Sequence, residues 1–162
     1  MKSSRKIQRT ILRRKRKSTS AIHKLQDQAT RLRAKIFRFL PCAVCLSFNK
    51  KNYETVPAHL LNSGSYGSKK WDMWNLLPLC SEHHTNGTEI SSHAPGGDTG
   101  VIKNFVAWLK NTLPRHYNWY VINKDDRAPH KLSLGDMGEI CGGLQYYADY
   151  PGKAEGLIYE KA

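Results

Sequence analysis

The chain has 162 residues, and its 26 Lys and Arg against 13 Asp and Glu give a formal net charge of +13. This length predicts one compact domain with some additional chain and excludes a large two-domain enzyme. A hydrophobic content of 40% excludes full disorder, and no apolar run approaches the roughly 18 residues of a membrane-spanning helix. The charge excess predicts a polyanionic partner, with nucleic acid ranked ahead of an acidic membrane surface.

The positive charge is concentrated at the N-terminus. Residues 1–40 contain 14 basic residues and one acidic residue, whereas the other 122 residues contain 12 of each sign. Residues 1–19 are predicted to form a flexible basic arm, or a helix induced on binding. The arm contains five consecutive cations, Arg13, Arg14, Lys15, Arg16 and Lys17. We interpret them first as a phosphate-binding run; a nuclear-import signal, a mitochondrial transit peptide and a solvated charge run are the alternatives.

Apolar residues at spacings of three and four predict an amphipathic helix between residues 20 and 40. Ser20 is its expected N-cap, and Pro41 is its expected stop. We favour a helix that faces the core over a short dimer seam, because the stripe is shorter than about three to four heptads. The stripe consists of Ile22, Leu25, Ala29, Leu32, Ile36 and Phe39.

The cysteines predict a metal site rather than disulfides. The N-terminus lacks the apolar stretch of a secretory signal, so we expect a reducing, intracellular compartment. A C-x2-C pair is followed 34 residues later by C-x2-H, and three thiolates with one imidazole suit structural zinc. The four ligands are Cys42, Cys45, Cys80 and His83. Cys141 lies outside this set and is expected to be a small buried residue.

The segment between the two ligand pairs predicts a small finger. Residues 53–61 indicate a strand that ends near His59, residues 62–70 a loop of Gly, Ser and Lys, and residues 75–80 a second strand. Ser81 then caps a short helix. The order of these elements is strand, loop, strand and helix, and the four zinc ligands would hold them together; we call these ligands the zinc clip. This order predicts an α+β chain built on a ββα finger.

The segment from Cys42 to His93 resembles the HNH endonucleases of the ββα-metal, or His-Me finger, class. Within that class it is most similar to phage recombination nucleases of the Ref and NinG type. The matching stretches are CAVC, VPAHLL, GSYGSKKWD and NLLPLCSEHH. The resemblance implies a metal-dependent endonuclease that hydrolyses phosphodiester bonds in DNA during recombination, repair or processing.

The resemblance also implies a role for individual residues. His59 matches the general base that takes a proton from the attacking water. Asn75 matches the central Asn, which ties the loop to the finger and helps to hold the base. His84 and His93 match ligands of a catalytic Mg²⁺ or Mn²⁺.

Two features depart from the family pattern. Ala58 occupies a position where many HNH fingers carry an Asp or His ligand. Asp72 is our candidate for an additional carboxylate ligand, or for a residue that organises the loop. The roles of His83 and His84 are also interchangeable at the level of sequence.

Residues 99–162 are predicted to form a neutral structural support. We expect a helix from Asp98 or Thr99 to Leu113, a strand over residues 119–122, and a last helix within residues 135–147. Residues 20–98 would then contain the amphipathic helix and the finger.

DNA is the expected partner, bound through its phosphate backbone by the arm and by Lys69 and Lys70 of the loop. A recombination protein is a further candidate partner, and no membrane partner is expected. The expected location is the cytoplasm of a bacterial or phage-infected cell, or the nucleus of a eukaryotic cell. A non-catalytic zinc-finger nucleic-acid-binding protein and a nucleic-acid-packaging protein are the alternative functions.

Overall fold

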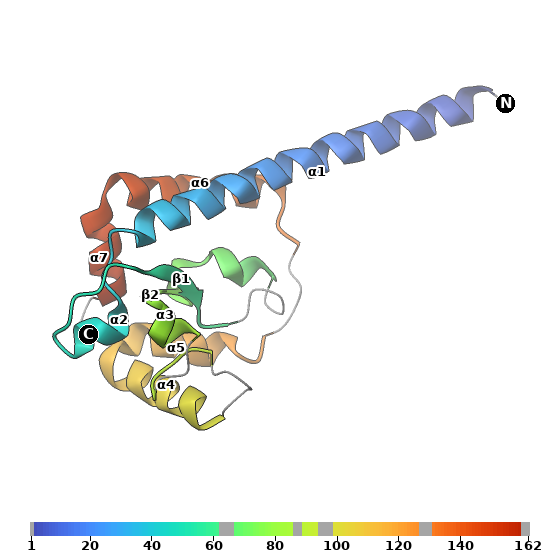
Figure 1. Cartoon of the computed structure of the whole chain (residues 1–162). Coiled ribbons are helices and arrows are strands. Elements are labelled where there is room, and N and C mark those ends of the chain that lie inside the picture. The colour runs from blue at the N-terminus through green and yellow to red at the C-terminus, as the bar shows by residue number, and fades with distance from the viewer. Residues whose placement is uncertain (1, 62–66, 86–88, 94–98, 127–130, 160–162) are drawn as a thin grey trace.

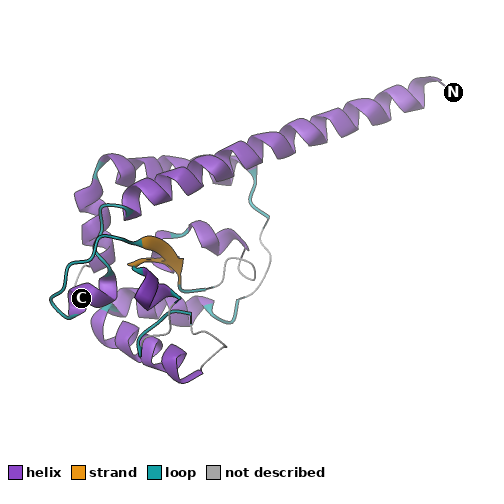
Figure 2. Ribbon diagram, viewed as in Figure 1, coloured by secondary structure: helices purple, strands orange, loops and turns teal. Residues whose placement is uncertain are grey.

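The computed structural model describes residues 2–61, 67–85, 89–93, 99–126 and 131–159, with side chains from residue 20 onward (Figure 1). In this part of the chain, helices surround one two-stranded antiparallel sheet, an arrangement compatible with an α+β fold (Figure 2). The elements are α1 (Lys2–Phe37), α2 (Ala43–Ser47), β1 (Val56–His59), the 3₁₀ helices η1 (Gly67–Trp71) and η2 (Met73–Asn75), β2 (Leu76–Leu79), α3 (Ser81–His84), α4 (Thr99–Thr112), α5 (Pro114–Asn123), α6 (Leu134–Asp149) and α7 (Pro151–Tyr159).

Helix α1 is longer than the sequence predicted. It begins at Lys2, so the expected N-cap at Ser20 is wrong. Residues 1–40 contain no Gly or Pro, and nothing in the sequence therefore interrupts the helix before Pro41. Residues 1–19 were expected to form either a flexible arm or a helix induced on binding, and residues 2–19 are helical in the structure. Its N-terminal half projects away from the rest of the molecule (Figure 1), and the five cations of the arm lie outside the described side chains.

The C-terminal half of α1 packs against α6, as expected of a core-facing helix. Its apolar side chains Ala29, Leu32 and Ile36 are buried. On the opposite side of the interface, Cys141 is buried as predicted, and its Sγ donates to the Leu25 carbonyl at 3.3 Å. Phe39 is 54% exposed because the helix ends before it, and Phe37 is buried in its place.

The two strands predicted for the finger are present and pair antiparallel. Val56 lies opposite Leu79, and His59 lies opposite Leu76. All four residues of β2 are buried, whereas only Ala58 of β1 is, so the sheet is covered mainly through β2. Helix α3 follows β2 directly, with Cys80 rather than Ser81 at its N-cap.

The C-terminal third is entirely helical in its described residues. Helix α4 matches the predicted helix, but the strand predicted over residues 119–122 is wrong, because these residues belong to α5. Pro114 begins α5 at a position where its fixed φ angle favours a helix. Helix α6 covers the predicted last helix and is capped by Ser133 and Asp136, while α7 was not predicted. No helix in the described ranges is both long and apolar enough to cross a membrane.

Candidate functional site

Three cysteines and one histidine come together where α2, β2 and α3 meet. Cys42 precedes α2, Cys45 lies within it, Cys80 follows β2 as the N-cap of α3, and His83 lies in α3. The Nδ1 atom of His83 is 3.6 Å from the Sγ of Cys42, 3.6 Å from that of Cys45 and 3.2 Å from that of Cys80. The Cys45 and Cys80 sulfurs are 3.9 Å apart. All four donor atoms lie within 4.8 Å of one another.

These distances fit a tetrahedral zinc ion. Zn–S bonds of about 2.3 Å and a Zn–N bond of about 2.0 Å require S···S separations near 3.8 Å and S···N separations near 3.5 Å. The measured 3.9, 3.6, 3.6 and 3.2 Å are close to these values. The set is therefore compatible with a structural zinc site, and it is His83 rather than His84 that completes it.

The electrostatics of the cluster favour a cation at its centre. Burial, followed by the neighbouring Cys42 and Cys80, raises the pKa of the Cys45 thiol to about 12. Burial also raises the pKa of Cys80. Three buried thiolates would repel one another, and a dication between them offsets that cost.

Local backbone contacts shape the turn that carries the first ligand pair. After α2 the chain reverses at Asn49, whose φ of 58° lies in the left-handed region that Asn tolerates better than most residues. The reversal lets the Lys50 amide donate to the Cys45 carbonyl at 2.9 Å. On the other side, the Tyr159 hydroxyl donates to the Pro41 carbonyl, which ties α7 to this turn.

His59 ends β1 and is held beside the loop that contains η1. Its Nε2 is 3.2 Å from the Lys70 carbonyl oxygen and 3.2 Å from Arg33 Nη1. Burial, followed by the charge of Arg33, lowers the pKa of His59 to about 4; His84 and His93 make smaller contributions in the same direction, and the Lys70 carbonyl opposes them. The imidazole is therefore neutral at pH 7 and able to accept a proton.

Asn75 joins the end of β1 to the same loop. The side chain is fully buried, and its Oδ1 accepts from the Leu61 amide at 2.7 Å. Its Nδ2 donates to the Leu61 carbonyl at 3.3 Å and to the Lys69 carbonyl at 3.0 Å. These contacts are of the kind that the resemblance implies for the central Asn.

His84 and His93 lie next to each other, with ring centroids 5.2 Å apart. The His93 amide donates to the His84 carbonyl at 3.0 Å, and His84 is half-buried whereas His93 is exposed. Burial, followed by His93, lowers the pKa of His84. Within the described ranges, the zinc-type set is the only group of three or more donors, so the two histidines are a pair without a third ligand there. Ala58, which is 1% exposed, supplies none.

Asp72 has the contacts expected of a residue that organises the loop. Its Oδ1 accepts from the Trp74 amide and caps η2, and its Oδ2 accepts from Trp119 Nε1, both at 2.9 Å. Because both oxygens accept hydrogen bonds within the protein, the geometry favours this role over metal ligation.

The two loop lysines are less available to DNA than the sequence suggested. Lys69 has a side chain that is 12% exposed, and its Nζ donates to the Asn123 carbonyl and to two oxygens of Asp126. Lys70 places its Nζ 4.5 Å from the centre of the Trp71 ring. Burial, followed by the charge of Arg33, lowers the pKa of Lys70.

Arg33 is the residue that the sequence analysis missed. It lies beside His59 although α1 is 26 residues away along the chain. A signal was present, because Arg33 is four residues after Ala29 and three before Ile36, and therefore belongs to the buried face of the helix.

No protein-family model matches the chain, and neither a curated protein nor a solved structure matches it. The functional assignment therefore depends on the chemistry of the site itself. That chemistry consists of a zinc-type cluster, a neutral histidine at the other end of the two-stranded sheet, and a pair of further histidines.

Proposed function

We propose that the protein is a metal-dependent DNA endonuclease of the HNH, ββα-metal type, acting in phage or bacterial DNA recombination, repair or processing. The observation that supports this best is the environment of His59. Its neutral, half-buried imidazole lies close enough to His84 and His93 for their charges to lower its pKa, and His84 directly follows His83 of the cluster suited to zinc. A pure zinc module has no need of such an arrangement.

The hydrogen bonds of His59 define which of its nitrogens acts. Nε2 lies 3.2 Å from the Lys70 carbonyl oxygen, and in the tautomer that donates to this oxygen Nδ1 is free to accept a proton from water. The Asn75 bonds to Leu61 and Lys69 hold the end of β1 and the loop on either side of the base. His59 therefore keeps one ring orientation as the proton is transferred.

The zinc clip would act through structure rather than chemistry. Cys42 and Cys45 belong to the turn around α2, whereas Cys80 and His83 flank the start of α3. A zinc ion held by all four would fix α3, and with it His84, relative to the sheet that carries His59.

His84 and His93 are the residues that would hold a catalytic Mg²⁺ or Mn²⁺. When bound, such an ion would stabilise negative charge on the scissile phosphate. The two imidazoles supply only part of the coordination of an octahedral ion, so water and DNA oxygens would complete it. Their position next to each other keeps both rings on one side of α3.

The basic half of α1 would supply affinity for DNA without reading its sequence. Residues 1–40 carry the entire net charge, whereas the proposed base and metal ligands lie in the neutral remainder. Attraction to DNA and cleavage of DNA are therefore assigned to different parts of the chain.

Cleavage assays test this proposal. The protein is incubated with Mg²⁺ or Mn²⁺ and supercoiled plasmid, single-stranded DNA or branched DNA. His59→Ala is expected to cut at least about 100-fold more slowly, because a general base contributes a factor of about 10² to 10⁴. His23→Ala, which changes an exposed histidine of α1, is the matched control. Absence of cleavage on all substrates, or equal rates for His59→Ala and wild type, would refute the proposal.

A non-catalytic zinc-finger nucleic-acid-binding protein is the second candidate. It is favoured by Ala58, which cannot ligate a metal, and by the lack of a third ligand beside His84 and His93 in the described ranges. Equal DNA binding by wild type and His59→Ala, with no cleavage by either, would establish this function instead.

A further inference from the structure

Arg33 is a buried cation without a counter-ion among the described residues. The residue is only 8% exposed, and no ion pair joins it to a carboxylate in the described ranges. Burial lowers the pKa of its guanidinium. Arginine is rarely buried unless it is paired, because an uncompensated charge away from water is unfavourable.

Half of the guanidinium has no hydrogen-bond partner among the described residues. Arg33 uses only Nη1, which donates to the Lys70 carbonyl at 2.7 Å and lies 3.2 Å from His59 Nε2. The Nε atom is buried and has no partner. Nε and Nη2 form the side edge of the guanidinium, whose two parallel N–H bonds match two oxygens of a carboxylate or a phosphate.

Among the described residues, the side chains that interact with the Arg33 guanidinium are neutral or positive. Lys70 and His59 both have pKa values lowered in part by the charge of Arg33, and His84 and His93 lower the pKa of His59 as well. The Trp71 ring lies against the guanidinium, with its centroid 4.5 Å from Cζ. A buried place where several nitrogen donors meet without an acid is suited to an anion.

We propose that the free edge of Arg33, beside His59, binds an oxyanion of tetrahedral phosphate, and that this phosphate belongs to the nucleic-acid backbone. Phosphate is preferred over carboxylate because residues 1–40, most of which form the same helix, carry the whole charge excess of the chain. The assignment of this phosphate to a nucleic acid rests on the proposed function. The assignment of an anion site at Arg33 does not.

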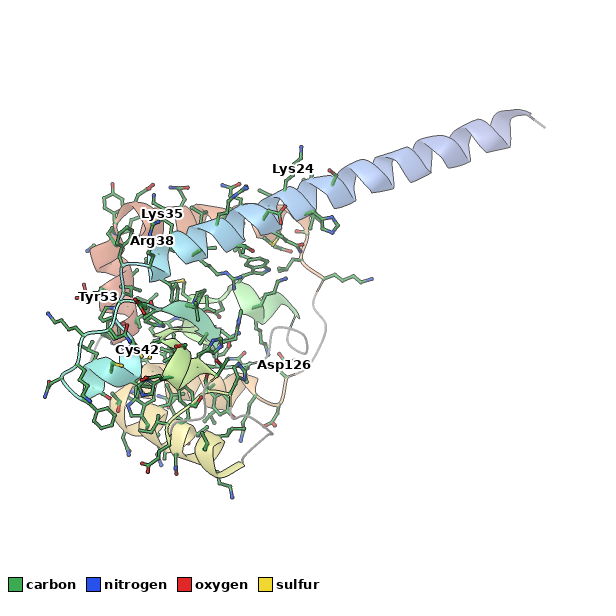
Figure 3. All side chains as sticks on the ribbon, viewed as in Figure 1. Lys24, Lys35, Arg38, Cys42, Tyr53 and Asp126 are labelled. Carbon is green, nitrogen blue, oxygen red and sulfur yellow. The ribbon has the colours of Figure 1, made fainter. Side chains whose placement is uncertain are left out.

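The position of Arg33 on α1 connects the site with the arm. At about 1.5 Å per residue, Lys17 and Arg33 are about 24 Å apart along one helix. Exposed cations of the same helix, such as Lys24, point away from the body (Figure 3). Helix α1 therefore carries exposed cations that can contact the DNA backbone, and it also carries the Arg33 guanidinium, which lies beside His59.

The test compares Arg33→Met with Arg31→Met in the full-length, zinc-loaded protein. Arg31 is exposed on the same helix, so both variants lose one charge, but only one loses the buried guanidinium. Thermal unfolding is followed while inorganic phosphate, or a short phosphodiester oligonucleotide, is added. Both ligands are expected to raise the melting temperature of wild type and Arg31→Met, and to raise that of Arg33→Met much less. Without ligand, Arg33→Met should melt at or above the wild-type temperature, since a costly buried charge has been removed.

Cleavage by Arg33→Met is expected to be slower by about tenfold or more, as for loss of a charge-assisted hydrogen bond. Equal phosphate responses in both variants, or a response to inorganic phosphate and none to the oligonucleotide, would overturn the assignment. If Arg33→Met does not fold, the Arg33 Nε resonance of wild type is followed by ¹⁵N NMR. A resonance that does not shift on addition of the oligonucleotide overturns the proposal as well.

The two proposals fail separately. A wild-type protein that never cleaves, but whose phosphate response depends on Arg33, retains the anion site and refutes the nuclease. Cleavage by wild type and Arg33→Met at equal rates, with equal phosphate responses, retains the nuclease and refutes the anion site.

Discussion

Replacing Cys45 by Ser is expected to abolish zinc binding and to unfold the region around His59. Cys45 is one of four donors that connect α2, the end of β2 and α3. A structural zinc ion contributes about 10–16 kcal/mol of apparent binding free energy, whereas a typical domain is stable by only about 5–15 kcal/mol. The contribution of zinc is therefore as large as the whole stability, and its loss cannot be absorbed elsewhere.

The structure also gives the pH dependence of this binding. The pKa values of the Cys45 and Cys80 thiols are both raised, that of Cys45 to about 12, so both thiols are protonated at pH 7. Zinc must displace these two protons at least. For each displaced proton, the apparent zinc-binding constant falls about tenfold when the pH is lowered by one unit. With two protons displaced, the affinity should fall at least about 100-fold for each pH unit below neutrality.

Metal analysis and thermal unfolding test both statements. Wild type and Cys141→Ser are expected to hold one zinc ion per chain and to melt at a lower temperature after treatment with a chelator. Cys141 is the matched control, because it is a buried thiol outside the cluster. Cys45→Ser should hold no zinc after dialysis. Equal zinc contents in Cys45→Ser and wild type, or a melting temperature that a chelator leaves unchanged, would refute the reasoning.

Three further predictions concern other parts of the structure. Burial lowers the pKa of His116 to about 4, so the unfolded chain binds more protons than the folded chain between pH 6.5 and 4. As the pH falls through this window, up to about 3 kcal/mol of stability should be lost. Denaturant unfolding at several pH values measures this loss, and His116→Phe should lose less stability than wild type. Asn75→Ala removes two buried hydrogen bonds and one part-buried hydrogen bond and is expected to cost about 2–3 kcal/mol. Asn118→Ala, at an exposed position, should cost little; equal costs in denaturant unfolding would contradict this. Deleting residues 1–18 should remove most of the salt dependence of DNA binding. If the arm neutralises about six phosphates, the logarithm of the binding constant of the full chain falls with the logarithm of the salt concentration with a slope near −5. An unchanged slope after the deletion would assign the phosphate contacts to other residues.

The parts of the fold that the sequence predicted are those fixed by short-range patterns. The C-x2-C and C-x2-H pairs define the metal-ligand set, and the two strands between them follow from their apolar runs. The strand predicted over residues 119–122 failed because a run of aromatic and β-branched residues is ambiguous when read alone. Pro114 begins a helix that packs against α4 and η2, and this packing decides the structure of the run.

Helix α7 was missed for a related reason. Pro151, Gly152 and Gly156 are poor helix formers, so residues 151–159 have weak intrinsic preference for a helix. In the structure, Ala154 and Ile158 lie four residues apart and are both buried. Burial of this face supplies the stabilisation that local preference lacks.

The surroundings of His59 come from three segments far apart in the sequence, and no local pattern could have predicted all of them. Asn75 holds the loop from within the motif, the zinc-type clip fixes α3, and Arg33 reaches His59 from α1. The C-terminal half of α1 is therefore part of the site, whereas the arm of residues 1–19 contributes no described contact to it. A truncation before residue 19 removes cations only. One that shortens α1 further removes the packing against α6 that keeps Arg33 beside the base.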